Sequence, residues 1–331
     1  MFSYVNKRLI KVTGERGGWF SRADALEAGY TDSEIRLRLR KGLWTRLCRD
    51  VYVETGSWPD GEPPWERTRR LHQLMARAVT HRLDGEVVVS HQSATLLRGL
   101  PNWDLDHGRV QVTRTSGRAR SDRAVQIHRS PLELDDVSEL AGLRLTSPAR
   151  AVVETTCTSS YEVGVVLSDA ALRGGLVTKE QLVRMAQRLE HWPGSPAACA
   201  AVGFADGASE SVGESRLRVL MANEGIPSPE LQVEIRDSEG RLLGRVDFLV
   251  CRRLIVEFDG AQKYDSVKDL VAEKWREDRL RDLGYSFARV GWADLDHPRE
   301  TGHRLHQSLA RSLDRSLTSA LVVALNTKEG P

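Results

Sequence analysis

The apolar positions of the first 57 residues fall into short blocks separated by helix-capping residues and glycines. Ser21 and Thr31 are each followed three residues later by an acidic residue, which is the capping-box pattern at the start of a helix. A glycine just past the last turn is a common helix end, and one follows each block, at Gly17, Gly29 and Gly42. The pattern therefore predicts three short helices, the first beginning near residue 3.

Beyond Gly42 the pattern changes from helical to extended. Two short extended runs, residues 43–47 and 51–53, are joined through Arg49 and Asp50. Three helices followed by a small β-hairpin is the order of a winged helix-turn-helix, and we expect this domain over residues 1–57.

The remaining chain reads as two further regions separated by linkers. A Pro- and Gly-rich stretch, SWPDGEPPW, follows the first domain, and strands then alternate with helices, so we expect an α/β middle domain over residues 66–200. A second linker, GFADGASESVG, precedes a last domain over residues 208–315. There the order is helix, three extended runs, charged helix and final strand, an α-β-β-β-α-β arrangement. The fold class is α/β in the mixed α+β sense.

Charge divides the chain in a way that its net value of +2 conceals. Residues 1–130 hold 23 Lys and Arg against 15 Asp and Glu, a net of +8, and the remainder holds 25 against 31. A basic front part favours a nucleic-acid partner. No run approaches the ~18 apolar residues of a membrane span, the N-terminus lacks the apolar block of a signal peptide, and the four cysteines form no CxxC pair. We expect a cytoplasmic protein without membrane contact.

The third helix and the hairpin carry the candidate DNA-binding residues. Ile35 and Leu39 stand four apart and can face a core, while cations surround them. A recognition helix needs an apolar seam for docking and free cations for phosphates and base edges. The alternative is a small helical domain with a solvated basic face. The candidates are Arg36, Arg38, Arg40, Lys41, Arg46 and Arg49.

The stretch GRVDFLV-CRR-LIVEFDG carries the candidate chemistry. Asp247 and Glu257 are equidistant from Arg252, so an antiparallel hairpin centred there places them opposite one another, and Asp259 follows on the same face. At about 4 Å such charges repel by roughly 1 kcal/mol in water and about 4 at an effective dielectric of ~20. A divalent cation relieves this repulsion, and oxygen ligands suit Mg²⁺ or Mn²⁺. Phosphodiester hydrolysis is the chemistry implied. The alternative is a set of edge charges turned to solvent.

This stretch, with KY, EKWREDRLRDLGY and ARVGWADL farther on, resembles the Vsr-like branch of the PD-(D/E)XK nucleases over about residues 210–295. The resemblance implies a restriction-endonuclease-like core in which Asp247, Glu257 and Asp259 are the catalytic and metal-binding acids. Glu214 matches the position where some members add an acidic ligand. The lysine expected two residues after the second acid is replaced by Asp259, and Lys263 or Lys274 could substitute for it.

The first two hundred residues resemble the AbiEi-type antitoxin regulators of type IV toxin–antitoxin systems. The motifs are GLWTRLCRDVYV, VVSHQSATLLRGLP and GLRLTSPARAVVET. This resemblance implies operator binding and transcriptional control. Our leading hypothesis is a DNA-binding protein with a Mg²⁺-dependent endodeoxyribonuclease domain. The alternative is a non-catalytic antitoxin-like regulator that uses the nuclease fold as a scaffold. Besides DNA, we expect a cognate toxin and a homodimer as partners.

Overall fold

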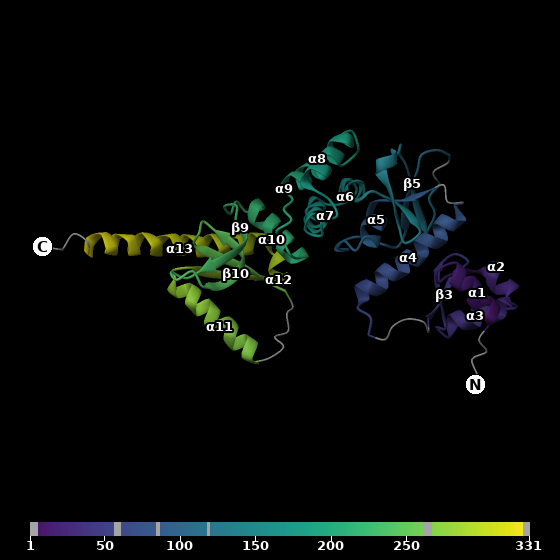
Figure 1. The fold of residues 1–331 in the computed structure, drawn as a ribbon, viewed down its shortest axis with the longest axis horizontal. Helices are drawn as coiled ribbons and strands as arrows, with labels where there is room; N and C mark the ends of the chain where they lie inside the picture. The colour runs from purple at the N-terminus through teal and green to yellow at the C-terminus, as the bar shows by residue number, and fades with distance from the viewer. Residues whose placement is uncertain (1–5, 56–60, 84–86, 118–119, 261–266, 327–331) are drawn as a thin grey trace. The chain divides into compact units, whose positions relative to one another are not determined.

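The computed structural model describes residues 6–55, 61–83, 87–117, 120–260 and 267–326 (Figure 1), with side chains in the last range described for residues 274–314. The chain forms two compact units. The first is Met1–Leu167 with Leu176–Gly203, and the second is Ser168–Gly175 with Phe204–Pro331. Helices and three separate sheets confirm the mixed α/β class.

The N-terminal domain has the predicted order of helices and hairpin. Both predicted capping boxes are present: Asp24 N donates to Ser21 Oγ at 3.1 Å, and Glu34 N donates to Thr31 Oγ1 at 3.3 Å. A two-residue strand that the sequence did not predict joins the hairpin, giving the sheet order β1-β3-β2. The elements are α1 (Lys7–Glu15), β1 (Phe20–Ser21), α2 (Arg22–Glu27), α3 (Asp32–Arg40), β2 (Trp44–Cys48) and β3 (Val51–Glu54).

This three-stranded sheet has an apolar cluster on each face. Tyr52 packs with Phe20, Ile35 and Trp44 on the face covered by the three helices. Its neighbours on β3, Val51 and Val53, belong to the other cluster, because successive strand residues point to opposite faces. That second cluster includes Trp19 with Leu74 and Ala78 of the long helix α4 (Pro64–Arg82). The helices α3 and α4 therefore lie on opposite faces of the sheet.

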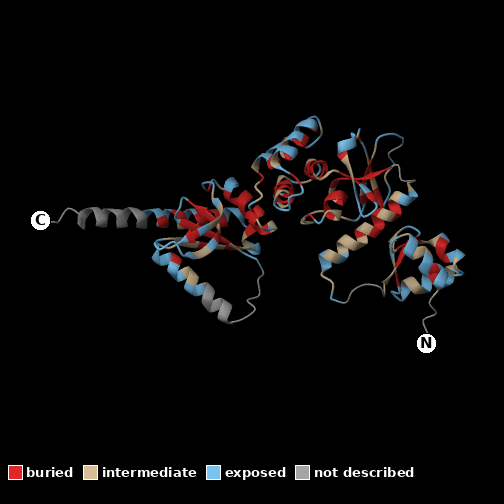
Figure 2. Cartoon of the chain, in the orientation of Figure 1, coloured by how far each residue is buried: buried red, intermediate tan, exposed pale blue. Residues whose placement is uncertain are grey.

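The middle region is built on a five-stranded sheet of order β6-β5-β4-β8-β7. Met75, Ala76 and Val79 of α4 pack against Val89 and Val112 of this sheet, and buried residues line its inner strands (Figure 2). Its elements are β4 (Val88–Val89), α5 (His91–Leu97), β5 (Val110–Arg114), β6 (Val125–Arg129), a 3₁₀ turn (Leu134–Asp136), β7 (Val137–Leu140), β8 (Leu143–Thr146), α6 (Pro148–Cys157), α7 (Tyr161–Arg173), α8 (Lys179–Arg188) and α9 (Ser195–Phe204).

The second unit contains the predicted α-β-β-β-α-β order. Its sheet has the order β12-β11-β10-β9, with β11 and β12 parallel and the other neighbours antiparallel. Leu217 of α10 packs with Phe248 and Val256 in one cluster, and Leu280 of α11 packs with Ile255 in another. The elements are α10 (Val212–Asn223), β9 (Glu230–Arg236), β10 (Leu242–Val250), β11 (Leu254–Asp259), α11 (Val267–Asp282), β12 (Ser286–Gly291), α12 (Trp292–Leu295) and α13 (Pro298–Asn326).

None of the helices in the described part of the chain combines the length and the apolar character needed to cross a membrane.

Candidate nucleic-acid interface

The third helix is anchored by its apolar side and exposes its basic side. Ile35 is buried among the aromatic residues of the domain core. Arg36, Arg40 and Lys41 are exposed. Because the helix begins with a capping box and acids in its first turn and ends with arginines, its own dipole favours this distribution of charge. The helix is thus stably placed while three cations extend from it.

Arg38 has a different environment from the other cations of α3. Its guanidinium carbon lies 4.8 Å from the centre of the Tyr30 ring and 5.3 Å from that of Trp44, so it makes cation–π contacts with the domain core. The side chain is half-buried. Arg38 therefore contributes to packing, whatever it contributes to binding.

The hairpin presents two further cations. Arg46 is exposed, and its guanidinium carbon lies 5.8 Å from the centre of the Tyr52 ring, on the sheet face that α3 also covers. Arg49 lies at the hairpin turn with a side chain that is 92% exposed, and its Nε is 3.6 Å from the Asp50 carboxylate. Arg46 therefore lies on the sheet face that α3 covers, and Arg49 extends from the tip of the wing.

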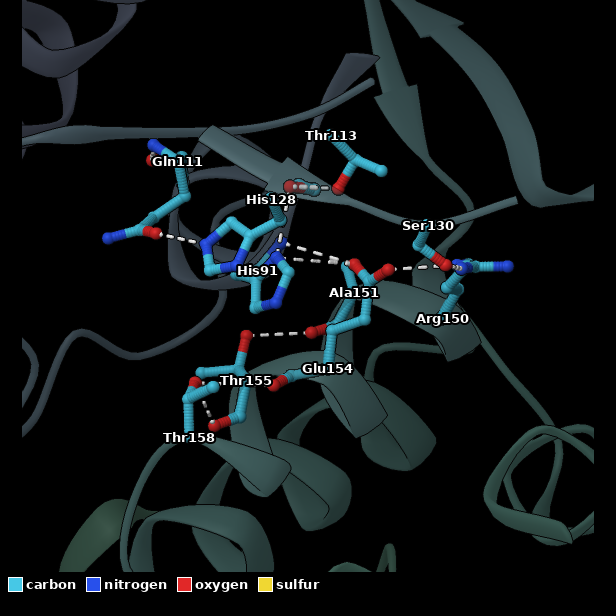
Figure 3. A network of polar contacts seen from close by, with 12 residues as sticks. His91, Gln111, Thr113, His128, Ser130, Arg150, Ala151, Glu154, Thr155 and Thr158 are labelled. Atoms are coloured by element: carbon cyan, nitrogen blue, oxygen red, sulfur yellow. Dashed lines mark hydrogen bonds and ion pairs between the residues drawn. The ribbon is translucent and has the colours of Figure 1, made fainter. Parts of the chain in front are cut away.

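A buried polar network lies beneath the middle sheet (Figure 3). Arg150, 2% exposed, donates from Nη1 to Asp136 at 2.5 Å, from Nε to Glu154 at 2.8 Å and from Nη2 to Ser130 Oγ at 2.8 Å. Burial raises the pKa of Glu154, and the bonds from Arg150 oppose that rise. A buried charge is tolerable when paired and hydrogen-bonded in this way.

His91 belongs to the same network. Its backbone N–H donates to Glu154 at 3.3 Å, and its ring stacks on that of His128 with centroids 3.7 Å apart (Figure 3). Burial lowers the pKa of His91 to about 3 and that of His128 to about 4, so both imidazoles are neutral near pH 7. His91 is 1% exposed, and its place in this closed network fits a structural role.

In the second unit, the hairpin register agrees with the sequence prediction. Phe248 pairs with Val256 and Val250 with Leu254, and the same register places Asp247 opposite Glu257. Asp247 Oδ2 accepts a hydrogen bond from the backbone of Phe258 at 2.9 Å. The carboxylates therefore come from adjacent strands, as expected.

Two arginines bind the acids of β11. Arg276 donates to Glu257 Oε1 at 2.9 Å, and Arg289 Nη2 lies 3.6 Å from Glu257 Oε2. Arg289 also donates to Asp259 at 3.2 Å. The like-charge repulsion that suggested a divalent cation is thus compensated by guanidinium groups from α11 and β12.

Glu214 lies in the first turn of α10 and accepts from the backbone N–H of Glu210 at 2.8 Å and from Gln232 Nε2 at 2.9 Å. Burial raises its pKa, and the nearby charge of Asp247 adds to the rise. Lys263 lies outside the described residues, and Lys274 is exposed on α11. Among the residues the structure describes, no three Asp, Glu, His or Cys side chains form a group that could hold a metal ion.

The groups that partner these acids are not predicted from the sequence. Gln232 lies on β9, 3.4 Å from Asp247 Oδ1, and Arg289 is the parallel-strand neighbour of Glu257. The α-β-β-β-α-β order could have suggested that the last strand lies beside β11. It does not set the register that brings Arg289 to Glu257.

The exposed basic helix, the wing and the packed core define residues 7–55 as a winged-helix domain. These residues match the family described as transcriptional regulator, AbiEi antitoxin, so the N-terminal domain is AbiEi antitoxin-like. That match does not extend to residues 208–315, for which the Vsr-like resemblance gained no support.

The chain is similar to two proteins of Mycobacterium tuberculosis, the uncharacterized proteins MT2308 of strain CDC 1551 / Oshkosh and Rv2248 of strain ATCC 25618 / H37Rv. Each is 30% identical over 181 residues, which are 54% of this chain and 65% of the relative, just under two thirds of its length. A crystal structure of the RV2827C protein from the same species has 15% identity and a TM-score of 0.38, and covers 61% of this chain and 78% of that one. That likeness is too weak to carry an argument.

Proposed function

We propose that this chain is a DNA-binding transcriptional regulator of the antitoxin type. The observation that carries the proposal is the set of exposed cations on α3 and on the wing of a well-packed winged helix. The AbiEi antitoxin-like character of residues 7–55 supports it. In this role α3 enters the major groove, and the wing arginines contact the adjoining phosphates.

Binding to the DNA upstream of its own gene tests the proposal. The full chain should bind a labelled duplex of that region at least 10³-fold more tightly than a scrambled duplex, the lower end of the usual specific-to-non-specific ratio. A promoter–reporter fusion should be repressed by the chain. Equal affinity for both duplexes, together with an unchanged reporter signal, would contradict a regulatory role.

We further propose that residues 208–315 act as a scaffold or DNA contact without cutting DNA. The arginine contacts to Glu257 and Asp259 support this, because they compete with any cation for the same oxygens. Supercoiled plasmid should stay intact when incubated with the chain and Mg²⁺ or Mn²⁺. Nicking that disappears in Asp247→Ala would overturn the scaffold proposal and restore the nuclease hypothesis.

A homodimer and a cognate toxin belong to the same proposal. Winged-helix and related regulators commonly bind two half-sites as symmetric dimers. Light scattering at concentrations that saturate DNA should give twice the mass of 37.0 kDa. Co-expression with the product of an adjacent gene should relieve growth arrest if that product is the toxin.

A further inference from the structure

A cleft of about 620 Å³ opens in the first unit, on the α4 side of the winged-helix sheet. Residues from four separate segments of the chain line it, and three of these segments contribute the polar side chains. The end of α1 and the residues after it contribute Arg16 and Trp19, α4 contributes Arg77 and His81, and the beginning of β8 contributes Arg144. The volume lies within the range of about 300–1,000 Å³ that is usual for small-molecule sites.

The charge of the cleft is predominantly positive. Three guanidinium groups line it and Glu15 is its one acidic lining residue among those the structure describes. Arg16 is held by Asp24, at 2.8 Å from Nη1 to Oδ2, with its guanidinium carbon 4.8 Å from the centre of the Trp19 ring. The cation is therefore fixed in place while half-buried.

Arg77 spans two of the cleft walls. Its Nη2 donates to the carbonyl of Ala141 in the turn between β7 and β8, at 2.7 Å. The same guanidinium lies so close to Gly17 that a Cβ there would come within 2.4 Å of Nη1. Gly17 also has a φ of +72°, a left-handed conformation that suits glycine. The glycine thus leaves room for the Arg77 guanidinium beside the cleft. Arg144 lies on β8 and is exposed.

The two faces of the winged-helix sheet distinguish this cleft from the DNA surface. The recognition helix α3 and Arg46 lie on the face of Tyr52. Trp19 and α4 lie on the face of Val51 and Val53. A duplex docked on α3 would therefore contact the opposite side of the sheet from the cleft. The cations of the cleft lie on that opposite side, which favours a small anion as their ligand and not the DNA bound at α3.

We propose that the cleft binds a small phosphorylated molecule of roughly nucleotide size. Guanidinium groups present parallel N–H donors that match phosphate oxygens, and here they converge from three segments that a ligand would bridge. A nucleotide and a simple phosphate ester share this chemistry. The proposal does not depend on the DNA-binding function, because no residue of the α3 interface lines the cleft.

Titration calorimetry of the full chain with ATP, inorganic pyrophosphate and adenosine tests the proposal. ATP and pyrophosphate should bind with one site per chain, and adenosine should not. Comparable affinity for ATP and pyrophosphate would point to a phosphate-only site, and tighter binding of ATP to a nucleotide site. Arg144→Gln should weaken binding about tenfold or more, since a hydrogen bond to a charged group accounts for at least that factor.

The matched control is Arg129→Gln, an exposed arginine of the same sheet outside the cleft, which should bind both probes as the unchanged chain does. An unchanged melting temperature of Arg144→Gln would show that lost binding is not lost folding. Absence of binding by both probes would overturn the proposal, as would equal weakening by the two variants. If the phosphate probes did not bind and Arg144→Gln reduced the affinity for duplex DNA, the cleft would belong to the DNA surface and the proposal would be wrong.

Discussion

Replacing Arg36 and Arg40 together by Gln is the sharpest perturbation of the proposed DNA interface. Both side chains are exposed on α3, so the change should remove phosphate contacts without altering the core. The logarithm of the DNA-binding constant falls with the logarithm of salt concentration by about 0.9 per neutralised phosphate. Losing two contacts should make that slope shallower by about 1.8. Between 50 and 200 mM salt, a fourfold range, the variant should lose about tenfold less affinity than the unchanged chain.

Fluorescence anisotropy with a labelled duplex at several salt concentrations measures the slope, and urea unfolding measures stability. Arg38→Gln is the contrasting variant. Its cation–π contacts with Tyr30 and Trp44 are lost, so the free energy of unfolding should fall by about 0.5–2 kcal/mol. The Arg36 and Arg40 variant should unfold as the unchanged chain does. If the salt slope of the Arg36 and Arg40 variant were the same as that of the unchanged chain, α3 would not be the helix that contacts phosphate.

Three further outcomes follow from other parts of the molecule. Burial, with the neighbouring His107 adding to it, lowers the pKa of His72 to about 3, so below pH 6.5 the unfolded chain takes up a proton that the folded chain does not. Between pH 6.5 and 5 this one group should lower the unfolding free energy by about 1.6 kcal/mol, so the fall measured by urea unfolding should be smaller by that amount in His72→Gln than in the unchanged chain. Gly213→Ala should lower the free energy of unfolding by about 1–3 kcal/mol, because a Cβ there would lie 2.0 Å from the Phe258 ring. Gly203→Ala, with open space around the new Cβ, should raise it by up to about 1 kcal/mol. Thermal melts compare the two variants. Arg289→Ala should destabilise the chain by about 1–3 kcal/mol by leaving carboxylates without their bonds, and an unchanged urea midpoint would show that the ion-pair cluster is not stabilising.

Much of the local structure could be predicted from residues a few positions apart. The capping boxes at Ser21 and Thr31 depend on an acid three residues away, and both formed as predicted. The hairpin register of Asp247 against Glu257 depends on a short turn around Arg252, and it too is as predicted. These signals are reliable because the groups that satisfy each other lie within one turn of helix or hairpin.

The roles of the charged side chains depended on contacts that local pattern does not encode. Arg38 looked equivalent to its neighbours on α3, yet it lies over rings from Tyr30 and Trp44. The sequence predicts a metal site at the acids of β11 and shows none of the groups that contact them. Arg276 and Arg289 reach them from a later helix and strand.

The sequence by itself determined the three helices and hairpin of the N-terminal domain, the α-β-β-β-α-β order of the last domain and the opposition of Asp247 and Glu257. These follow from caps, glycines and strand periodicity, whose energies involve near neighbours. Only the tertiary structure decided that guanidinium groups neutralise the acids of β11. It also decided that Arg16, Arg77 and Arg144 line one cleft. The physical reason is that the partner of a charge is set by how helices and sheets pack, through contacts between residues far apart in the chain.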